Sequence, residues 1–537
     1  MPASLRYISI VVLASLLFFP FLGQVHLFDW DEINFAECAR EMIVSHDYLR
    51  VQIDFQPFWE KPPLFIWLQV LSMKIFGVNE YAARFPNALT GVITLVTLFH
   101  VGKKVVNERM ATWWVLLYAA TWLPHFYFKT GIIDPVFNLF IFLAFYQVYQ
   151  LRHTDRKMLH AILGGIFIGL AVLTKGPVAL LVAMLALGVY IIWNKGFWGI
   201  SIAHLAIVVV VALLTTGVWF GVEIAHHGIG LVTDFIVYQV RLFRTEDAGH
   251  GGPFYYHFII LLLGCFPASL FLFQYRNFRS KDAELQRDFT SWMWIMFWVV
   301  LILFSIVKTK IVHYSSLCYF PLTFLAALQV YKLSEGEATI KGWVRTLLLI
   351  IGSLVAIAIT LLPVVGINKH LLIPYIDDPF AVGNFQSAVH WGYAEAAWGL
   401  LYLAGIIAAV VLIKKQFAKG MLLLCAVQLV IIQVTVIHFT PKIEAFSQRA
   451  AIEYFESLKG KDAYVQVLGY KSYAHLFYTD AQPHSNKNYY DTNWLLWGEV
   501  DKPTYFICKI MDKEKYLALP QIEYIGEKNG FVFMKRK

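Results

Sequence analysis

Long apolar runs recur along most of the chain and limit its possible folds more than any other feature. A helix needs roughly 20 mainly apolar residues to cross a hydrocarbon core of about 30 Å, and about thirteen such runs precede residue 440. The runs lie near 6–24, 79–102, 110–126, 132–151, 159–174, 177–194, 199–222, 255–275, 290–307, 311–331, 344–365, 393–413 and 420–438. The sequence therefore predicts a polytopic α-helical membrane protein.

Composition agrees with this prediction and excludes other classes. Of the 537 residues, 58% are hydrophobic and only 15% are charged, whereas soluble proteins have about 25% charged residues. The abundant aromatic residues exclude a disordered chain, and no Gly-X-Y period indicates collagen. The five cysteines show no CxxC or Cys/His spacing, so we expect them to be packing residues rather than metal ligands or disulfides.

Basic residues distinguish the two faces of the membrane. Lysines and arginines gather after the second, fourth, eighth, tenth and twelfth apolar runs, which all fall on one side of an alternating topology. By the positive-inside rule this side is cytoplasmic, so the N-terminus with Arg6 lies inside and the chain after His438 lies outside. The net charge of +8 reflects this asymmetry, and we expect no nucleic-acid partner. No A-x-A site follows the first run, which favours a membrane span over a cleaved signal peptide.

The last hundred residues differ from the rest of the chain, because polar and apolar residues mix from about Pro441 onward. The patterns predict a helix within 447–460, strands within 462–470 and 504–510, and a hairpin over 521–535 that turns at Asn529–Gly530. We therefore expect two domains. Residues 1–440 form the transmembrane domain, with amphipathic helices in a first outer loop at 25–78, and residues 441–537 form a small extracytoplasmic α/β domain.

Ionisable residues on the outer side mark the candidate site, because charges between apolar spans need partners or a function. They lie in DWDEINFAECAREM (29–42), FWEKPP (58–63), the turns with Lys129, Asp134 and TKGP (174–177), the loop 223–254 and KTKIVHY (308–314).

Each motif alone also has an ordinary structural explanation. Residues 29–42 could form an interfacial amphipathic helix with acidic residues in its first turn and with Glu37 and Glu41 on one face. Glu60 and Lys61 could form a structural ion pair, and Lys175 could extend its ammonium group to the membrane interface.

Together the motifs indicate transfer of a group from a lipid phosphate. Asp31 and Asp134 could accept a proton from an attacking hydroxyl or hold an amine. The leaving phosphate gains negative charge in the transition state, so preorganised cations stabilise that state more than the ground state. Four basic side chains are suited to hold a phosphate: Lys61, Lys175, Arg241 and Lys310.

The ordered set of motifs resembles one family, the bacterial C-type (GT-C) glycosyltransferases of the protein O-mannosyltransferase and lipid A aminoarabinose transferase group. The resemblance covers about residues 1–440 and is weak in the last hundred residues. It is carried by DExxFAExAREM from Asp31, EKPP from Glu60, IDP from Ile133, LTKGP from Leu173, RLF from Arg241, GHGGPF from Gly249 and KIVHY from Lys310.

The resemblance implies an integral-membrane enzyme that moves a hexosyl or pentosyl group from a polyprenyl (undecaprenyl) phosphate donor. The implied acceptor is a lipid A-like glycolipid or a protein at the periplasmic face of the bacterial inner membrane. By position, the implied catalytic residues are Asp31, Asp134 and Glu60, and those that bind the donor phosphate are Lys61, Arg241, Tyr314 and Lys175. Possible further substrate contacts are Glu37, Arg244, His250, Lys310 and His313.

Three points of this resemblance stay open. Either Arg241 or Arg244 could be the phosphate ligand, with Arg241 favoured. Some relatives bind a divalent metal ion near the Glu-Lys-Pro motif, and no other cofactor is expected. Asn34 and Phe35 stand where aminoarabinose transferases have Arg and Tyr. Because the missing guanidinium removes a bidentate partner, we expect a different donor sugar or acceptor.

The expected mechanism is an inverting displacement at the anomeric carbon, in which Asp31 acts as the base or orients the substrate. A transporter or flippase for lipid-linked sugars is the alternative, although transporters usually place polar groups near the bilayer midplane and this chain has them at span ends. A third hypothesis is an assembly protein whose C-terminal domain recognises an envelope partner.

Overall fold

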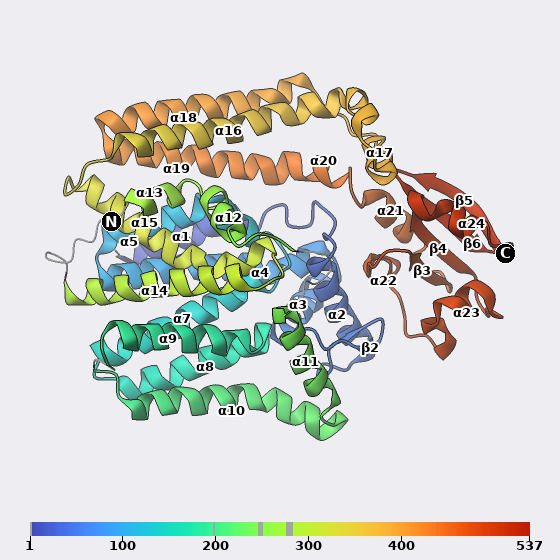
Figure 1. The fold of residues 1–537 in the computed structure, drawn as a ribbon, viewed down its shortest axis with the longest axis horizontal. Coiled ribbons are helices and arrows are strands. Elements are labelled where there is room, and N and C mark those ends of the chain that lie inside the picture. Colours follow the sequence, from blue (N-terminus) through green and yellow to red (C-terminus); the bar gives the residue numbers. More distant parts are fainter. Residues whose placement is uncertain (1–2, 197–198, 245–250, 275–282) are drawn as a thin grey trace.

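The computed structural model describes residues 3–196, 199–244, 251–274 and 283–537, with the side chains of residues 231 and 242–244 left out. Most helices run side by side in one bundle, and a small sheet-containing region lies at one end of it (Figure 1). The expected fold class, a polytopic helical membrane protein with a C-terminal α/β region, is confirmed.

Each expected apolar run falls on a helix. These helices are α1 (Ala3–Phe18), α4 (Glu80–Val105), α5 (Glu108–Ala119) with α6 (Trp122–Tyr127), α7 (Asp134–His153), α8 (Lys157–Lys175), α9 (Val178–Trp193), α10 (Ile202–His227), α12 (Tyr256–Gly264) with α13 (Ala268–Gln274), α14 (Glu284–Ile306), the 3-10 helix η1 (Val312–Cys318) with α15 (Tyr319–Ser334), α16 (Gly342–Ile367), η4 (Tyr393–Ala396) with α18 (Ala397–Lys415), and α19 (Phe417–Val434) with the π-helix η5 (Thr435–Phe439).

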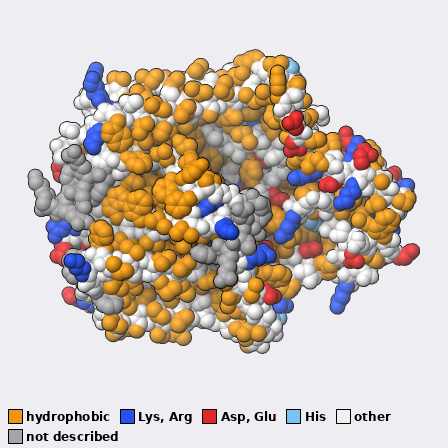
Figure 2. All heavy atoms as spheres, in the orientation of Figure 1, with side chains coloured by type: hydrophobic (Ala, Val, Ile, Leu, Met, Phe, Trp, Pro, Cys, Tyr) orange, Lys and Arg blue, Asp and Glu red, His pale blue; other side chains and the backbone are white. Residues whose placement is uncertain are grey.

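Among the described helices, 8 are long and apolar enough to cross a membrane, or 9 if α12 and α13, which are bent by 110°, form one span. The other runs form helices that are too short or, in the case of α7, not apolar enough to count among these. The total of about thirteen crossings therefore stays a prediction. Figure 2 shows apolar side chains over the middle of the molecule, with charged side chains concentrated toward its ends.

The two ends of the bundle carry the charges that the sequence assigned to opposite faces. Ion pairs join α7 to α14 and α5 to α15 at one end, through Arg152 and Glu284 and through Arg109 and Glu335. Asp134 and Lys175 meet at the opposite end, which faces the sheet region. The chain is thus a multi-pass membrane protein, and the assignment of the basic end to the cytoplasm stays a prediction.

The first outer loop forms α2 (Asp31–Ser45), the short strands β1 (Gln52–Ile53) and β2 (Gln56–Pro57), and α3 (Leu64–Phe76). Residues 32–42 of α2 are all buried, because α3 packs on this helix and the C-terminal region covers it as well. An interfacial position for α2 is therefore wrong: protein, rather than lipid and water, surrounds this helix.

The C-terminal region contains a four-stranded sheet of order β3-β4-β6-β5, in which β3 and β4 are parallel and the other pairs are antiparallel. The expected strands and hairpin are confirmed, since Asn529 (φ 50°) and Gly530 (φ 83°) form the turn between β5 and β6. The elements are α20 (Thr440–Glu444), α21 (Arg449–Ser457), β3 (Tyr464–Leu468), α22 (Ala474–Thr479), η6 (Lys487–Tyr490), α23 (Thr492–Trp497), β4 (Thr504–Lys509), η7 (Ile510–Asp512), α24 (Lys513–Leu517), β5 (Ile522–Lys528) and β6 (Phe531–Arg536).

Two further parts of the chain complete the end of the bundle that faces the sheet. Helix α11 (Gly230–Arg244) lies beside the first outer loop, and η2 (Lys369–Leu371), η3 (Ile373–Tyr375) and α17 (Pro379–Phe385) follow α16. Phe380 of α17 packs on Phe531 of β6, with ring centroids 5.0 Å apart. All five cysteines are buried and free, as expected of packing residues.

Candidate active site

Two helix N-termini bring Asp31 and Asp134 together. Asp31 is the first residue of α2 and Asp134 the first of α7, where Pro135 favours the start of a helix. Negative charge is favoured at both positions by the helix dipole. His313 of η1 lies between them, with Nε2 3.5 Å from Asp31 Oδ2 and 3.8 Å from Asp134 Oδ2. One imidazole therefore lies within reach of both carboxylates.

The two carboxylates differ in their exposure and partners. The Asp134 side chain is 2% exposed, and its Oδ1 accepts a 2.5 Å hydrogen bond from Lys175 Nζ. Its Oδ2 has no hydrogen-bond partner among the described residues. The Asp31 side chain is 30% exposed. Asp134 is thus tied to a cation, and Asp31 is the carboxylate that a substrate can reach.

The turn after Lys175 depends on a glycine. Gly176 has a φ of +89°, and a Cβ built there would lie 2.6 Å from Phe235 Cζ of α11. Only glycine tolerates both this backbone conformation and this close approach. The TKGP motif therefore lets α11 pack beside the end of α8, close to Lys175.

Tyr238 of α11 joins three of the expected site residues. Its hydroxyl donates a 3.0 Å hydrogen bond to Glu60 Oε2. Lys61 Nζ lies 5.7 Å and Arg241 Cζ 5.0 Å from the centroid of its ring, both within cation–π distance. The ring thus gathers two of the cations expected to bind phosphate. In the described structure Glu60 bonds to Tyr238 and makes no ion pair with Lys61.

Tyr314 lies beside Lys175 and His313, the two partners of Asp134. Lys175 Nζ lies 5.2 Å from the centroid of the Tyr314 ring, and the rings of His313 and Tyr314 are 5.4 Å apart. Lys61 is close enough to Asp134 for their charges to interact. The structure therefore brings Asp31, Asp134, Glu60, Lys61, Lys175, Arg241, His313 and Tyr314 into one region.

Two expected substrate contacts have structural partners instead. Glu37 is fully buried, and Arg40 donates hydrogen bonds of 2.6 and 2.8 Å to its two carboxylate oxygens. Lys310 Nζ donates to the carbonyls of Phe304, Ser305 and Val307, so it binds carbonyls at the end of α14. Both charges therefore have partners within the protein, and contacts of Glu37 and Lys310 with a substrate stay predictions. His250 and the Arg244 side chain lie outside the described residues.

A buried ion pair that the sequence analysis did not single out supports the site. Arg84 of α4 donates to both oxygens of Glu32, at 3.0 and 2.7 Å, and to the carbonyls of Leu22, Val25 and His26. Glu32 also accepts from the backbone N–H groups of Phe28 (2.9 Å) and Gly131 (2.5 Å).

This ion pair fixes the two candidate carboxylates relative to each other. Glu32 follows Asp31 directly, and Gly131 lies three residues before Asp134. Burial would raise the pKa of Glu32, but the charge and hydrogen bonds of Arg84 outweigh it and lower the pKa. The sequence does contain a sign of this ion pair, because Arg84 is the one arginine in the apolar run 79–102 and a charge in such a run needs a partner.

A second group of buried acidic residues lies further along α2. Glu41 accepts hydrogen bonds from the backbone N–H groups of Asp54 (2.6 Å) and Phe55 (2.8 Å) in the turn between β1 and β2. Burial and the nearby Glu37 raise the pKa of Glu41 well above its usual value. Burial, followed by the charge of Glu37, raises the pKa of Asp54 to about 8.

The departure at residue 34 has a local role. With the amide oriented to satisfy both of its atoms, Asn34 donates to the Trp30 carbonyl at 3.0 Å and accepts from the Trp30 indole at 3.1 Å. The side chain is buried. Asn34 thus fixes Trp30, the residue that precedes Asp31, by two hydrogen bonds.

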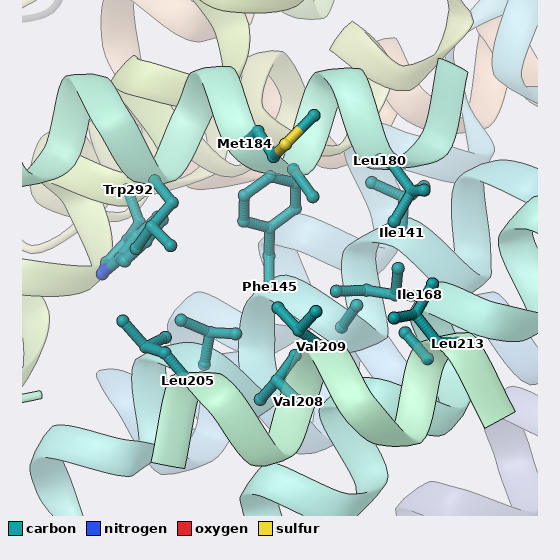
Figure 3. A pocket seen from close by; sticks show the side chains of 15 residues that line it. Ile141, Phe145, Ile168, Leu180, Met184, Leu205, Val208, Val209, Leu213 and Trp292 are labelled. Carbon is teal, nitrogen blue, oxygen red and sulfur yellow. The ribbon is translucent and has the colours of Figure 1, made fainter. Parts of the chain in front are cut away.

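Among the described residues, no group of three or more His, Cys, Asp or Glu side chains could hold a metal ion. An apolar cavity of about 220 Å³ lies between α7, α8, α9, α10 and α14 (Figure 3). Aliphatic and aromatic side chains line it, including Phe145, Met184 and Trp292, and none of the candidate residues does.

Comparison with known sequences identifies similar proteins. The dolichyl-phosphate-mannose-protein mannosyltransferase family matches residues 60–220. The undecaprenyl phosphate-alpha-4-amino-4-deoxy-L-arabinose arabinosyl transferase of Edwardsiella ictaluri is 29% identical over 363 residues, which are 66% of this chain and 64% of that protein. The protein of the same name from Pectobacterium carotovorum is 25% identical over 443 residues, or 77% of this chain and 78% of that protein. The match spans less than two thirds of the Edwardsiella protein.

A solved structure matches the whole chain. The crystal structure of ArnT from Cupriavidus metallidurans bound to undecaprenyl phosphate has a TM-score of 0.78 and 18% identity, and the match covers 99% of this chain and 98% of that one. At this identity the likeness concerns the fold. The family match thus covers residues 60–220, and the chain as a whole has the fold of this solved structure.

Proposed function

We propose that this protein is a glycosyltransferase that moves a sugar from a polyprenyl-phosphate donor to an envelope acceptor. One observation carries the proposal: an accessible carboxylate, Asp31, lies in the same region as the cations Lys61, Arg241 and Lys175 at one end of a membrane bundle. A displacement needs a base on one side of the sugar and a site for the leaving phosphate on the other.

The roles follow from exposure and charge. Asp31 is the base or the group that orients the acceptor, because a substrate can reach its carboxylate. Asp134 is bound to Lys175 and lies near His313, so it holds these two groups in place. Lys61 and Arg241, on the ring of Tyr238, hold the phosphate of the donor together with Tyr314.

The reaction is a single displacement. The acceptor oxygen forms a bond to the anomeric carbon as the bond from that carbon to the phosphate oxygen breaks. The acceptor proton passes to Asp31, and the electron pair leaves with the polyprenyl phosphate, whose growing charge the cations stabilise. The anomeric configuration inverts. A phosphate acceptor needs no deprotonation, in which case Asp31 orients the substrate.

The substrates are proposed from the related proteins. The names of those proteins specify undecaprenyl phosphate and an aminoarabinose, which supports an undecaprenyl-phosphate donor with a pentose or hexose. Because Asn34 binds Trp30 and supplies no guanidinium, we propose that the donor sugar or the acceptor differs from theirs. The acceptor is a lipid A-like glycolipid or a protein, at the periplasmic face of the bacterial inner membrane.

The proposed organisation matches this reaction. The transmembrane domain of residues 1–440 supplies the candidate catalytic residues, with the N-terminus in the cytoplasm. The domain of residues 441–537 then lies in the periplasm and covers the first outer loop. The basic end of the bundle and the apolar surface between the ends support this orientation.

The experiment tests transfer directly. Purified protein in lipid nanodiscs is incubated with a panel of radiolabelled polyprenyl-phosphate sugars and an envelope extract. We expect wild type to transfer one of them, and we expect Asp31→Asn and Lys61→Ala to lose transfer by about 100-fold or more. The matched controls are Asp462→Asn and Lys459→Ala, which change exposed residues of the C-terminal region.

The rival function gives a different result. If no donor supports transfer but the protein moves labelled donor across liposomes, and both site variants retain this movement, the protein is a transporter and the proposal is wrong. Loss of transfer in the control variants as well would also contradict the assignment of Asp31 and Lys61.

A further inference from the structure

The backbone immediately before Asp31 is held by the C-terminal region. The Leu27 N–H donates a 2.8 Å hydrogen bond to the Tyr478 hydroxyl of α22. Gln448, directly before α21, accepts from the Asp29 N–H at 3.2 Å and donates to the Leu27 carbonyl at 2.6 Å. Three backbone groups of residues 27–29 thus bind two side chains that lie more than 400 positions away in the sequence.

Side-chain contacts extend this anchor on both sides. His26 Nδ1 lies 3.1 Å from Glu444 Oε1. The centroids of the Trp30 and Tyr473 rings are 5.8 Å apart, and Lys471 Nζ lies 4.5 Å from the centroid of the Trp30 ring. Tyr478 also lies close enough to Glu80, the first residue of α4, for their charges to interact.

The geometry at Asp31 makes this anchor relevant to chemistry. Within the described residues, no side chain caps the start of α2, so the segment before it, together with the bonds of Glu32, sets the position of its first residue. Asp31 Oδ2 lies 3.5 Å from His313 Nε2, at the outer limit of a hydrogen bond. A shift of about 1 Å in a reacting group can lower a rate about 100-fold.

We propose that Tyr478 and Gln448 are positioning residues for Asp31, so that the C-terminal region forms part of the active site. The inference rests on the proposed function, in which Asp31 acts on the acceptor. It assigns a task to the last hundred residues, where the motifs of the sequence resemblance are weak. The two side chains act through the backbone of residues 27–29 and do not touch the reacting atoms.

The test removes each hydrogen bond without changing the size of the side chain. The variants are Tyr478→Phe and Gln448→Met. Their matched controls are Tyr464→Phe, which loses a 2.9 Å bond to Asp501, and Gln521→Met, which loses a 3.0 Å bond to the Leu496 carbonyl. All four substitutions remove side-chain hydrogen bonds of the same region, but only the first two change contacts to residues 27–29.

Two measurements decide the question. We expect kcat to fall about 10- to 100-fold in Tyr478→Phe and Gln448→Met, with the KM for the donor within about twofold of wild type, and the controls to keep wild-type kcat. We also expect amide hydrogen exchange of a peptide covering residues 26–31 to become faster in these two variants only. The exchange measurement needs no substrate.

The remaining outcomes separate a failure of the proposed function from a failure of the positioning role. If wild type transfers no sugar, the proposed function fails, and unchanged exchange in the variants would separately show that the anchor is wrong. If wild type is active and both variants keep control-like kcat, the positioning role is wrong even where exchange changes. A large drop in Tm with equal loss of donor binding would overturn the inference in favour of general folding support.

Discussion

The two halves of helix α2 hold buried carboxylates in opposite electrostatic settings. At the N-terminal end, the single carboxylate of Glu32 meets the guanidinium of Arg84, which also binds three carbonyls. Both oxygens of Glu32 accept hydrogen bonds from backbone N–H groups as well. The negative charge of Glu32 is thus matched by one cation, and both of its oxygens have hydrogen-bond donors.

Toward the C-terminal half of α2 the balance is different. Arg40 pairs with Glu37 and Asp480 and its charge also acts on Glu41. Asp54 lies close enough to Glu37 for their negative charges to repel, and no cation is among its partners in the described structure. Asp54 Oδ1 is buried with no hydrogen-bond partner in the described part of the chain. Negative groups are in excess, so protons are bound more tightly.

The comparison shows that burial alone does not decide what a carboxylate does. A buried acid with a complete set of partners stays charged and holds backbone segments in place, whereas acids that outnumber their cations take up protons. The balanced pair lies next to Asp31, where the proposed reaction needs a fixed geometry. Four substitutions or sets of substitutions test the contrast.

The largest effect is expected from removing the cation of the balanced pair. Arg84→Ala leaves Glu32 buried without its partner, which costs about 3–5 kcal/mol in buried pairs. We expect a large loss of folded protein and of Tm in detergent. Arg109→Ala is the control, because the Arg109 side chain is 74% exposed in its pair with Glu335 and such pairs contribute about 1 kcal/mol or less. Equal effects of the two substitutions would contradict the comparison.

The same substitution should have different effects at the two positions. Glu32→Gln removes the charge that Arg84 requires, so we expect a loss of about 2 kcal/mol or more. Glu41→Gln replaces a carboxyl that favours its protonated form, so no cation loses its partner. Its amide nitrogen cannot accept from one of the two backbone N–H groups that bind Glu41, so we expect a smaller loss of about 1 kcal/mol. Thermal unfolding at pH 7 measures both. A larger loss in Glu41→Gln than in Glu32→Gln would refute this assignment of charge.

The pH dependence of stability should report Asp54. Its pKa is 3.8 in the absence of burial and about 8 in the folded protein. Between these values the folded state holds a proton that the unfolded state releases, so stability falls as the pH rises from about 4 to 8. We expect Tm to fall by about 2 °C or more across this range.

Asp54→Asn removes that titration, so its Tm should depend less on pH than the Tm of wild type. Asp462→Asn, at an exposed carboxylate, is the control and should keep the wild-type dependence. A Tm profile of Asp54→Asn that matches wild type would assign the titration to other groups.

The smallest effect is expected at the exposed edge of the acidic group. Asp480→Ala removes one partner of Arg40, but the Asp480 side chain is 49% exposed and Glu37 still accepts two hydrogen bonds from the guanidinium. We therefore expect a loss of Tm equivalent to about 1 kcal/mol or less. A loss as large as that of Arg84→Ala would mean that Asp480 is needed to hold Arg40 against the buried acids after all.

Much of the fold followed from local patterns in the sequence. Apolar runs of membrane-spanning length mark the helices, because only helices and closed barrels satisfy backbone groups in lipid. Alternating residues and the Asn529–Gly530 turn were sufficient for the C-terminal strands and hairpin. The motifs also predicted that residues as distant as Asp31, Asp134 and His313 share one face of the membrane.

Two charged side chains, Glu37 and Lys310, have surroundings that their sequence patterns did not indicate. Glu37 has the pattern of an exposed helix face, but the C-terminal region covers that face. Lys310 has the charge for binding phosphate, yet three carbonyls at the end of α14 accept its hydrogen bonds. Neither outcome can be inferred without knowing which surfaces meet.

The sequence by itself determined the membrane-spanning class and the α/β character of the last hundred residues, because these depend on composition and periodicity within short windows. Only the tertiary structure decided which carboxylate is accessible, which acids are balanced by a cation, and that residues 444–478 hold the backbone before Asp31. These properties depend on burial and on contacts between segments more than 400 residues apart, and no local pattern records them.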